Sequence, residues 1–248
     1  DGKDLLVRSV DEKPYRSSPK APFTTSTLQQ EAGRKLRLSG RQVMSVAQGL
    51  YERGFITYMR TDSVTLSSEA INEIRSYVER QHGSNYLYPK GPRTFQNKVK
   101  NAQEAHEAIR PAGDAFKTPG ELAPELSRDE FALYDLIWKR TVASQMADAK
   151  KMQMRVDFDA TTNDKKETVF RANGSVITFP GFLAAYDDIV EEKTDEESED
   201  KRLPAMTLGQ AVKVNEYNCE GHDTKPPARY TEPTLVKKLE ELGIGRPS

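Results

Sequence analysis

The spacing of apolar residues changes once along the chain, and this change limits its fold more than any other feature. Between residues 24 and 147, apolar side chains recur every three to four residues, which places them on one face of a helix. From Met152 to Phe158 every second residue is apolar, as in a strand with one buried face. The pattern predicts an α+β protein with a helical block and an antiparallel sheet as separate parts.

Capping signals divide the helical block. A serine followed three residues later by Gln or Glu has the spacing of a capping box, and it precedes three of the apolar stripes. Gly54 stands where a C-terminal cap belongs. Helices are therefore expected to begin near Ser26, Ser39, Ser67 and Ser127, to include Ala102 to Ile109, and to resume at Thr231 with Leu235, Val236, Leu239 and Leu242 inside.

Short β-prone segments flank the helices. Residues around Leu5 to Val10 predict one strand, and Pro14 then indicates a linker. Turn signals at residues 162–164 and at Asn173-Gly174 predict a meander of short strands. The remaining strands are expected at Val169–Ala172, Ser175–Phe179 and Ala211–Tyr217.

The simplest organisation has three parts. Residues 1–23 and 148–222 would form a β domain, and residues 24–147 an all-α domain inserted into it. Residues 223–248 would be the start of a further helical domain. We expect both ends of the sequence to lie within a longer chain, because it lacks an initiator Met and stops directly after a helix and a glycine-rich turn.

Charge and hydropathy restrict the class of protein. No apolar run approaches the roughly 20 residues of a membrane span, which predicts a soluble protein. The single cysteine fits the reducing cytosol, so we expect a cytoplasmic protein. The net charge is −1, but residues 191–200 alone carry −6, so the rest carries +5, compatible with a nucleic-acid partner. The acidic run itself indicates a solvated loop. Cys219 is the only cysteine, which excludes a multi-cysteine zinc site within this sequence.

One connection between helices concentrates reactive side chains. Residues 54–63 join two expected helices and contain Tyr58, Arg60, Thr61, Asp62 and Ser63. On an extended stretch, residues 58 and 60 point to the same side. A guanidinium beside a phenol favours attack on a phosphodiester, because it lowers the cost of forming phenolate and stabilises charge on the phosphoryl oxygens. By spacing alone, the commoner explanation is a half-buried tyrosine covered by an arginine.

The motif resembles a known family. Phe55-Ile-Thr-Tyr-Met-Arg-Thr-Asp-Ser63 is similar to the active-site motif of bacterial type IA DNA topoisomerases. Three further stretches resemble the family in the same order, so that the resemblance covers the whole chain. They are Ala21 to Ala32, Ala105-His-Glu-Ala-Ile-Arg-Pro111, and Lys225 to Glu232 continuing through Gly243-Ile-Gly-Arg-Pro-Ser248.

The resemblance implies specific roles. Tyr58 would form a 5′-phosphotyrosine link, Arg60 would stabilise the scissile phosphate, His106 would hydrogen-bond nearby, and Asp62 would orient His106 or Arg60. The enzyme would relax negative supercoils without ATP, and the sequence has no Gly-x-x-x-x-Gly-Lys-Ser/Thr loop. The residues expected to contact DNA, chiefly single-stranded, are Arg60, Thr61, Ser63, Arg110, Arg229, Arg246 and Ser248.

The family's magnesium is held by a separate N-terminal Toprim domain, which we expect to be a partner outside this sequence. The Asp157-Phe-Asp159 pair is a candidate for a metal site within this sequence, because it has the Asp-x-Asp pattern. Its place on the polar face of an expected strand is explained by alternation alone, so no metal ligand is predicted here. The isolated chain would then cleave DNA poorly.

Two other readings stay open. In a non-catalytic module that binds single-stranded DNA, Tyr58 and Arg60 would only contact the sugar-phosphate backbone of the DNA. A tyrosine recombinase would need several arginine and histidine ligands around its tyrosine, and only Arg60 and His106 are candidates.

Overall fold

The computed structural model describes residues 4–96, 107–113, 116–161, 166–186 and 203–244. Contacts divide the chain into two compact units. The first, here called the β unit, comprises Asp1–Ser17, Asp148–Gly181 and Asp187–Pro227. The second, the helical unit, comprises Ser18–Ala147, Phe182–Tyr186 and Ala228–Ser248. The expected combination of helices with an antiparallel sheet is confirmed.

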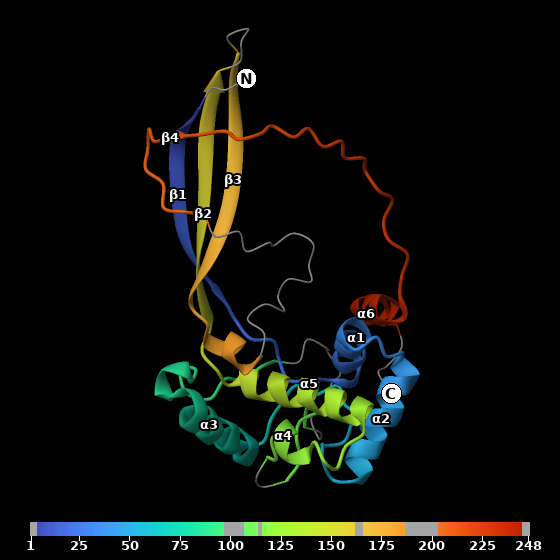
Figure 1. Ribbon diagram of the computed structural model, residues 1–248. Coiled ribbons are helices and arrows are strands. Elements are labelled where there is room, and N and C mark those ends of the chain that lie inside the picture. The colour runs from blue at the N-terminus through green and yellow to red at the C-terminus, as the bar shows by residue number, and fades with distance from the viewer. Residues whose placement is uncertain (1–3, 97–106, 114–115, 162–165, 187–202, 245–248) are drawn as a thin grey trace. The chain divides into compact units, whose positions relative to one another are not determined.

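The β unit is built on one antiparallel sheet with strand order β3-β2-β1-β4 (Figure 1). The three long strands lie side by side and are each 13 residues in length. The strands are β1 (Leu5–Ser17), β2 (Ala149–Thr161), β3 (Glu167–Phe179) and β4 (Ala211–Val212).

Two strand boundaries predicted from the sequence are wrong. β1 continues through Pro14, which lies opposite Met152. Since β4 pairs only with Leu5 and Leu6, this end of β1 is a sheet edge, where a residue without an N–H is tolerated. Asn173-Gly174 is no turn, because both residues pair with β2 inside the continuous strand β3. Pairing along the whole length of β2 outweighs the local turn preference.

The strand predicted at Ala211–Tyr217 is also too long, since β4 has two residues. Beyond Val212 the chain leaves the sheet, and the ring of Tyr217 packs against Phe170 with centroids 5.7 Å apart. The apolar alternation of β2 is confirmed. Val156 and Phe158 form a small core with Val7, and Leu203 and Met206 pack against it.

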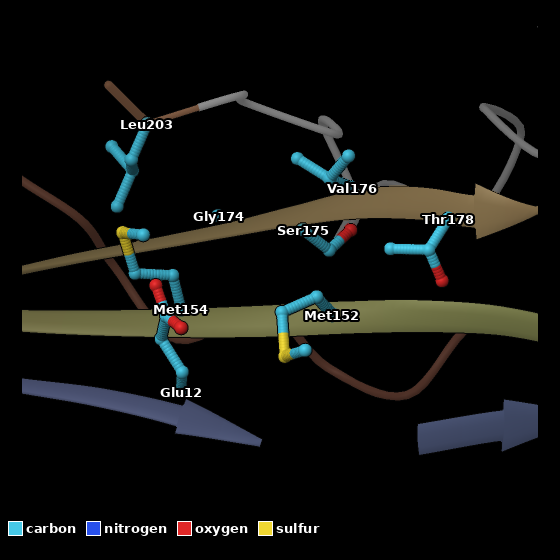
Figure 2. Close-up of a pocket in the computed structure, with 8 residues that line it drawn as sticks. All are labelled: Glu12, Met152, Met154, Gly174, Ser175, Val176, Thr178 and Leu203. Atoms are coloured by element: carbon cyan, nitrogen blue, oxygen red, sulfur yellow. The ribbon is translucent and has the colours of Figure 1, made fainter. Parts of the chain in front are cut away.

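A shallow cavity of about 220 Å³ opens on the apolar face of this sheet. Met152 and Met154 of β2 form its floor, and Gly174 leaves room beside Met154 because it has no side chain (Figure 2). Leu203 lies at one end of the cavity. The cavity is almost wholly apolar and has few groups that could orient a ligand.

The opposite face of the sheet is polar and carries cross-strand ion pairs. Arg171 Nε lies 2.7 Å from Asp157 Oδ1, and Arg8 Nη1 lies 3.2 Å from Asp159 Oδ1. The Arg171 hydrogen bond lowers the pKa of Asp157. Both carboxylates of the Asp-x-Asp pair are thus engaged by arginines of neighbouring strands.

The helical unit contains the remaining elements. They are α1 (Thr25–Lys35), α2 (Gly40–Glu52), α3 (Ser68–His82), the 3₁₀ turn η1 (Ser84–Tyr86), α4 (Pro119–Leu122), α5 (Arg128–Ser144), the 3₁₀ turn η2 (Gly181–Ala185) and α6 (Glu232–Glu241). Its largest fully buried side chains include Phe23, Leu28, Leu50, Ile109 and Tyr134. In Figure 1, α6 lies beside α1.

Most of the predicted helix ends are confirmed. Ser39 and Ser127 form capping boxes, and Ser67 accepts the Ala70 N–H. The first helix is the exception, because Thr24 rather than Ser26 is its cap and Thr27 completes the box. Thr24 directly precedes the helix and has extended backbone angles, whereas Ser26 already lies in the first turn.

The helix predicted at Ala102–Ile109 is wrong at its described end. Residues 97–106 lie outside the described residues, but Ala108 and Ile109 are extended. Ile109 forms an antiparallel bridge with Phe23, and the Ala108 N–H donates to Thr65 O. Long-range backbone pairing therefore replaces the helical hydrogen bonds of this stretch.

The closing helix begins after Thr231 as expected, but its leucines do not face inward. Leu235, Leu239 and Leu242 are exposed. The helix instead meets α1 through Pro233, which lies against Gly33, and the start of α2 through Glu232, which lies against Gly40. Within the described residues, no helix has the length and hydropathy needed to cross a membrane.

Candidate active site

The segment that carries Tyr58 starts from the end of α2. That helix ends at Glu52, and Gly54 follows with φ of 74°, a left-handed conformation that costs glycine little. The Gly54 N–H donates to Tyr51 O and the Phe55 N–H to Leu50 O. These two bonds close the helix and turn the chain into an extended segment.

The first residues of this segment are paired with residues 110–112. Ile56 forms an antiparallel bridge with Pro111, and the Thr57 N–H donates to Arg110 O over 2.9 Å. The Thr57 hydroxyl donates to Ala108 O at 2.7 Å and accepts the Arg110 N–H at 3.0 Å. Thr57 thus fixes the backbone next to Tyr58 against the stretch that follows His106.

The later residues of the segment are held by the first residue of α1. Thr25 Oγ1 lies 2.7 Å from Met59 O and accepts the Thr61 N–H at 2.9 Å. The Thr25 N–H donates to Thr61 O, also over 2.9 Å. The backbone is therefore fastened on both sides of Arg60.

Side chains alternate between the interior and solvent along residues 58–61. Met59 and Thr61 are buried, at 4% and 3% exposure, whereas Tyr58 is 40% exposed and Arg60 is exposed. The phenol-bearing residue and the guanidinium-bearing residue thus both face solvent. The ring of Tyr58 also meets the ring of Tyr51 edge-on, with centroids 5.2 Å apart.

The polar residues after Arg60 have internal partners. Thr61 Oγ1 accepts the Ser63 N–H at 3.0 Å, and Ser63 Oγ accepts the Thr65 N–H at 3.1 Å. Both residues are buried, and Asp62 between them is half-buried. Their hydroxyls stabilise the turn that leads from the segment to α3.

Arg110 is tied to Glu107. Arg110 Nη2 lies 2.6 Å from Glu107 Oε2, and Arg110 Nη1 donates to Pro111 O at 2.8 Å. Glu107 Oε1 also accepts the Ser67 N–H at the start of α3. Burial by itself raises the pKa of Glu107, but the bonds from Arg110 and Ser67 outweigh it, so the pKa is lowered.

Of the other residues predicted from the sequence, only Arg229 lies among the described residues. Arg229 lies in the exposed stretch before α6, and no described contact connects it to residues 55–63. His106, Arg246 and Ser248 lie outside the described residues, as do the acidic residues 191–200.

A dense group of charges surrounds Glu31 of α1. The carboxylate of Glu31 is within 4.0 Å of Lys20, Arg34, Lys35 and Arg140. Burial raises the pKa of Glu31, but the four cations together outweigh burial and lower it. Arg140 is buried and its guanidinium lies over the ring of Phe23, 4.4 Å from the centroid. The group fastens α1 to α5 and to the chain before α1.

Magnesium has no evident ligands among the residues that the structure describes. No three His, Cys, Asp or Glu side chains gather there in a metal-holding arrangement. Asp157 and Asp159 are bound to arginines on the sheet, and Asp62 is the only acidic residue within the Tyr58 segment. This donor set does not fit an Mg²⁺ ion, which prefers several oxygen ligands in octahedral geometry.

Three residues in or beside the segment could not be assigned a role from the sequence. Thr25 and Tyr51 contact the segment, and Thr57, which lies within it, bonds to Ala108. Thr25 and Thr57 fall inside the quoted motifs, but a threonine in a helix start or a β-prone stretch has an ordinary local explanation. Their contacts span 34 to 51 residues of sequence, so no local pattern indicates them.

Known proteins match the chain over its full length. A family model described as DNA topoisomerase matches residues 1–248. The protein named DNA topoisomerase 1 of Mycolicibacterium smegmatis is 56% identical over 249 residues, covering 100% of this chain and 26% of that protein. The Synechococcus elongatus protein of the same name is 57% identical over 246 residues, with 98% and 27% covered. The chain thus spans about a quarter of the length of these curated relatives.

The fold is also similar to a solved structure. The full-length topoisomerase I from Thermotoga maritima, in a monoclinic crystal form, superposes with a TM-score of 0.80 at 36% identity. The match covers 99% of this chain and 39% of the Thermotoga chain. The combination of helices with an antiparallel sheet is therefore similar to that of the Thermotoga protein.

Proposed function

Because this chain belongs to the family of bacterial type IA DNA topoisomerases, we propose that it is the tyrosine-bearing central part of an enzyme that cleaves and rejoins one DNA strand. One observation carries the proposal. Tyr58 and Arg60 are both exposed on a segment whose backbone is fastened on either side, at Thr57 and at Thr25. A nucleophile and a cation are thus presented to solvent from a rigid support.

The reaction is a transesterification at a DNA phosphate. The phenolic oxygen of Tyr58 attacks phosphorus and loses its proton, and an O–P bond forms to the 5′-phosphate. The bond from phosphorus to the 3′-oxygen breaks, and that oxygen takes up a proton to become a 3′-hydroxyl. Attack by the same hydroxyl reverses the step. The phosphotyrosine bond replaces the phosphodiester bond without hydrolysis, so rejoining the strand requires no ATP.

Arg60 stabilises the phosphate during this exchange. Its guanidinium can place two N–H donors on the phosphoryl oxygens, where negative charge grows as the phenol attacks. His106 and Asp62 are assigned, by resemblance to the family, to hydrogen bonding near the same phosphate and to orienting its ligands. Strand passage through the break relaxes negative supercoils.

Contacts with the DNA strand extend beyond the cleavage site. We assign Arg60, Thr61, Ser63, Arg110, Arg229, Arg246 and Ser248 to this role, with single-stranded DNA as the preferred form. The internal bonds of Thr61, Ser63 and Arg110 favour a contribution through backbone and local shape more than through free side chains. A cytoplasmic protein acting on the bacterial chromosome fits this assignment.

Magnesium belongs to the proposed activity of the whole enzyme, but the described residues of this chain do not fit it. We assign its ligands to the Toprim domain of a longer chain, which would be the partner of the helical unit during cleavage. The Tyr58 segment contributes the nucleophile and the phosphate-binding cation.

The test combines this chain with a separately made metal-binding domain, Mg²⁺ and a single-stranded oligonucleotide. The expected product is a covalent protein–DNA adduct that persists when the protein is denatured. Tyr58→Phe removes only the hydroxyl, so it should abolish the adduct and leave DNA affinity unchanged. An adduct that persists in Tyr58→Phe would remove the nucleophile assignment.

The same experiment decides the alternative of a non-catalytic DNA-binding module. Such a module binds the oligonucleotide equally well with Tyr or Phe at position 58 and gives no adduct under any condition. A complete enzyme carrying Tyr58→Phe then serves as the second measurement, since full relaxation of supercoiled DNA by that variant excludes the proposed role.

A further inference from the structure

Resting on the proposed function, we propose that Thr25 is a positioning residue that sets the reactive placement of Tyr58 and Arg60. Thr25 touches neither side chain in the contacts described above. It acts on the backbone of the residues that flank Arg60, from the first position of α1.

Thr25 makes three hydrogen bonds to this backbone. Its N–H donates to Thr61 O, and its hydroxyl oxygen accepts the Thr61 N–H, both over 2.9 Å. The hydroxyl proton has two carbonyls in reach, Met59 O at 2.7 Å and Thr61 O at 3.1 Å. Since Thr61 O already receives the Thr25 N–H, the shorter bond to Met59 O is the better use of that proton.

The hydroxyl is needed because it both donates and accepts. Thr25 is 2% exposed and Thr61 is 3% exposed, so water cannot readily replace a lost partner. Valine has nearly the same shape but no polar atom, and it would leave the Thr61 N–H without an acceptor in a buried place. Serine keeps the hydroxyl and loses only a methyl group.

The consequence for the site follows from alternation along an extended chain. Fixing residues 59 and 61 by their backbones keeps their side chains inward, where Met59 and Thr61 are buried. Neighbouring side chains then point outward. Tyr58 and Arg60 are the neighbours, and both are exposed. A rotation of the Met59 or Thr61 peptide planes would turn Arg60 away from its present direction.

Thr25 is itself well anchored. Thr24 caps the helix through a reciprocal box with Thr27, and Phe23 pairs with Ile109 across an antiparallel bridge. Arg140 lies over the ring of Phe23 and is bound to Glu31 of the same helix. The start of α1, which positions the Tyr58 segment, is therefore fixed by the capping box, by the bridge to Ile109 and by Arg140.

The first measurement reports the contact without any reaction. Amide hydrogen exchange of Thr61 in this chain should be slow in the unaltered protein and in Thr25→Ser, and faster in Thr25→Val. Thr27→Val is the matched control, since it removes a hydroxyl from the same helical turn whose only partner among the described residues is Thr24. In that control the Thr61 amide should keep its protection. Equal Thr61 exchange in Thr25→Val and the unaltered chain would overturn the proposal.

The second measurement reports the positioning role. In the complete enzyme with Mg²⁺ and single-stranded oligonucleotide, Thr25→Val should slow adduct formation by roughly tenfold to a hundredfold, the range for small misplacement of reacting groups. DNA affinity should not change, and Thr25→Ser should recover most of the rate. If Thr25→Val does not fold, Thr25→Ala provides the same comparison with less crowding.

The outcomes separate this inference from the proposed function. A normal adduct rate in a folded Thr25→Val protein would overturn the positioning role while leaving Tyr58 as nucleophile. An equal loss in Thr27→Val would also overturn it, because fraying of α1 would then explain the loss. An adduct formed by Tyr58→Phe would instead contradict the assignment of Tyr58 as nucleophile. Amide hydrogen exchange of Thr61 would still test the Thr25 contact in that case.

Discussion

The rings of Tyr51 and Tyr58 meet edge-on, with centroids 5.2 Å apart and planes inclined by 68°. Tyr51 belongs to the last turn of α2 and is as exposed as Tyr58, at 41% against 40%. Since the Tyr58 backbone is fixed by Thr57 and Thr25, the contact with Tyr51 limits the remaining freedom of the Tyr58 ring.

Removing the Tyr51 ring should therefore slow the proposed reaction. An edge-to-face pair stabilises by about 1 kcal/mol, which corresponds to roughly a fivefold effect on rate. Tyr51→Ala should lower the rate of adduct formation by about that factor in the complete enzyme, while Tyr51→Phe keeps the ring and the rate. A similar loss in both variants would show that the Tyr51 hydroxyl, and not the ring contact, matters.

The Glu107 carboxylate should make stability depend on pH. Its pKa is lowered in the folded chain, so its stabilisation is complete at pH values above its unfolded pKa of about 4.3 and is lost as pH falls through the lower folded value. Glu107→Gln should lower the free energy of unfolding at neutral pH by about 1 to 3 kcal/mol. The gap between the two proteins should close below about pH 4. Urea unfolding at several pH values checks this, and a constant gap would contradict it.

Glu31 should contribute far more to stability than an exposed carboxylate does. Glu31→Gln leaves Arg140, which is 8% exposed at its side chain, without its carboxylate partner. Breaking a buried pair of this kind costs roughly 3 to 5 kcal/mol. Asp159→Asn is the control, because its pair with Arg8 is about half exposed and should change stability by less than about 1 kcal/mol. Thermal unfolding of both variants measures the difference, and equal shifts would contradict it.

Gly33 should control the docking of α6 on α1. A Cβ at Gly33 would lie 2.5 Å from Pro233 Cγ, too close for the proline to stay in place. Gly33→Ala should speed trypsin cleavage after Lys237 and Lys238 of α6, although alanine favours the α1 helix by about 1 kcal/mol. Gly49→Ala is the matched helical control, because its Cβ would meet only Glu130 Oε1 at 3.8 Å.

In that control the helix should become more stable and cleavage of α6 should not change. Unaltered cleavage in Gly33→Ala would show that α6 can shift without leaving α1.

The accuracy of the sequence predictions follows the range of the interactions involved. Ser39, Ser67 and Ser127 cap their helices through partners within three residues, so the local sequence suffices. Asn173-Gly174 failed as a turn because pairing with β2 decides its conformation. Ile109 failed as a helical residue for the same reason, since its partner Phe23 is 86 positions away in the chain.

The period of each element, most helix starts and the motif that contains Tyr58 and Arg60 can be predicted from the sequence, because they depend on side-chain chemistry and near neighbours. The contacts that hold the motif in place depend on the folded chain. Thr25 bonds to Met59 from 34 positions away, and Ala108 accepts the hydroxyl of Thr57 from 51 positions away. Tyr51 reaches the motif across the reversal at Gly54. A hydroxyl that serves as donor and acceptor at once can be recognised only when the backbone groups on both sides of it are placed.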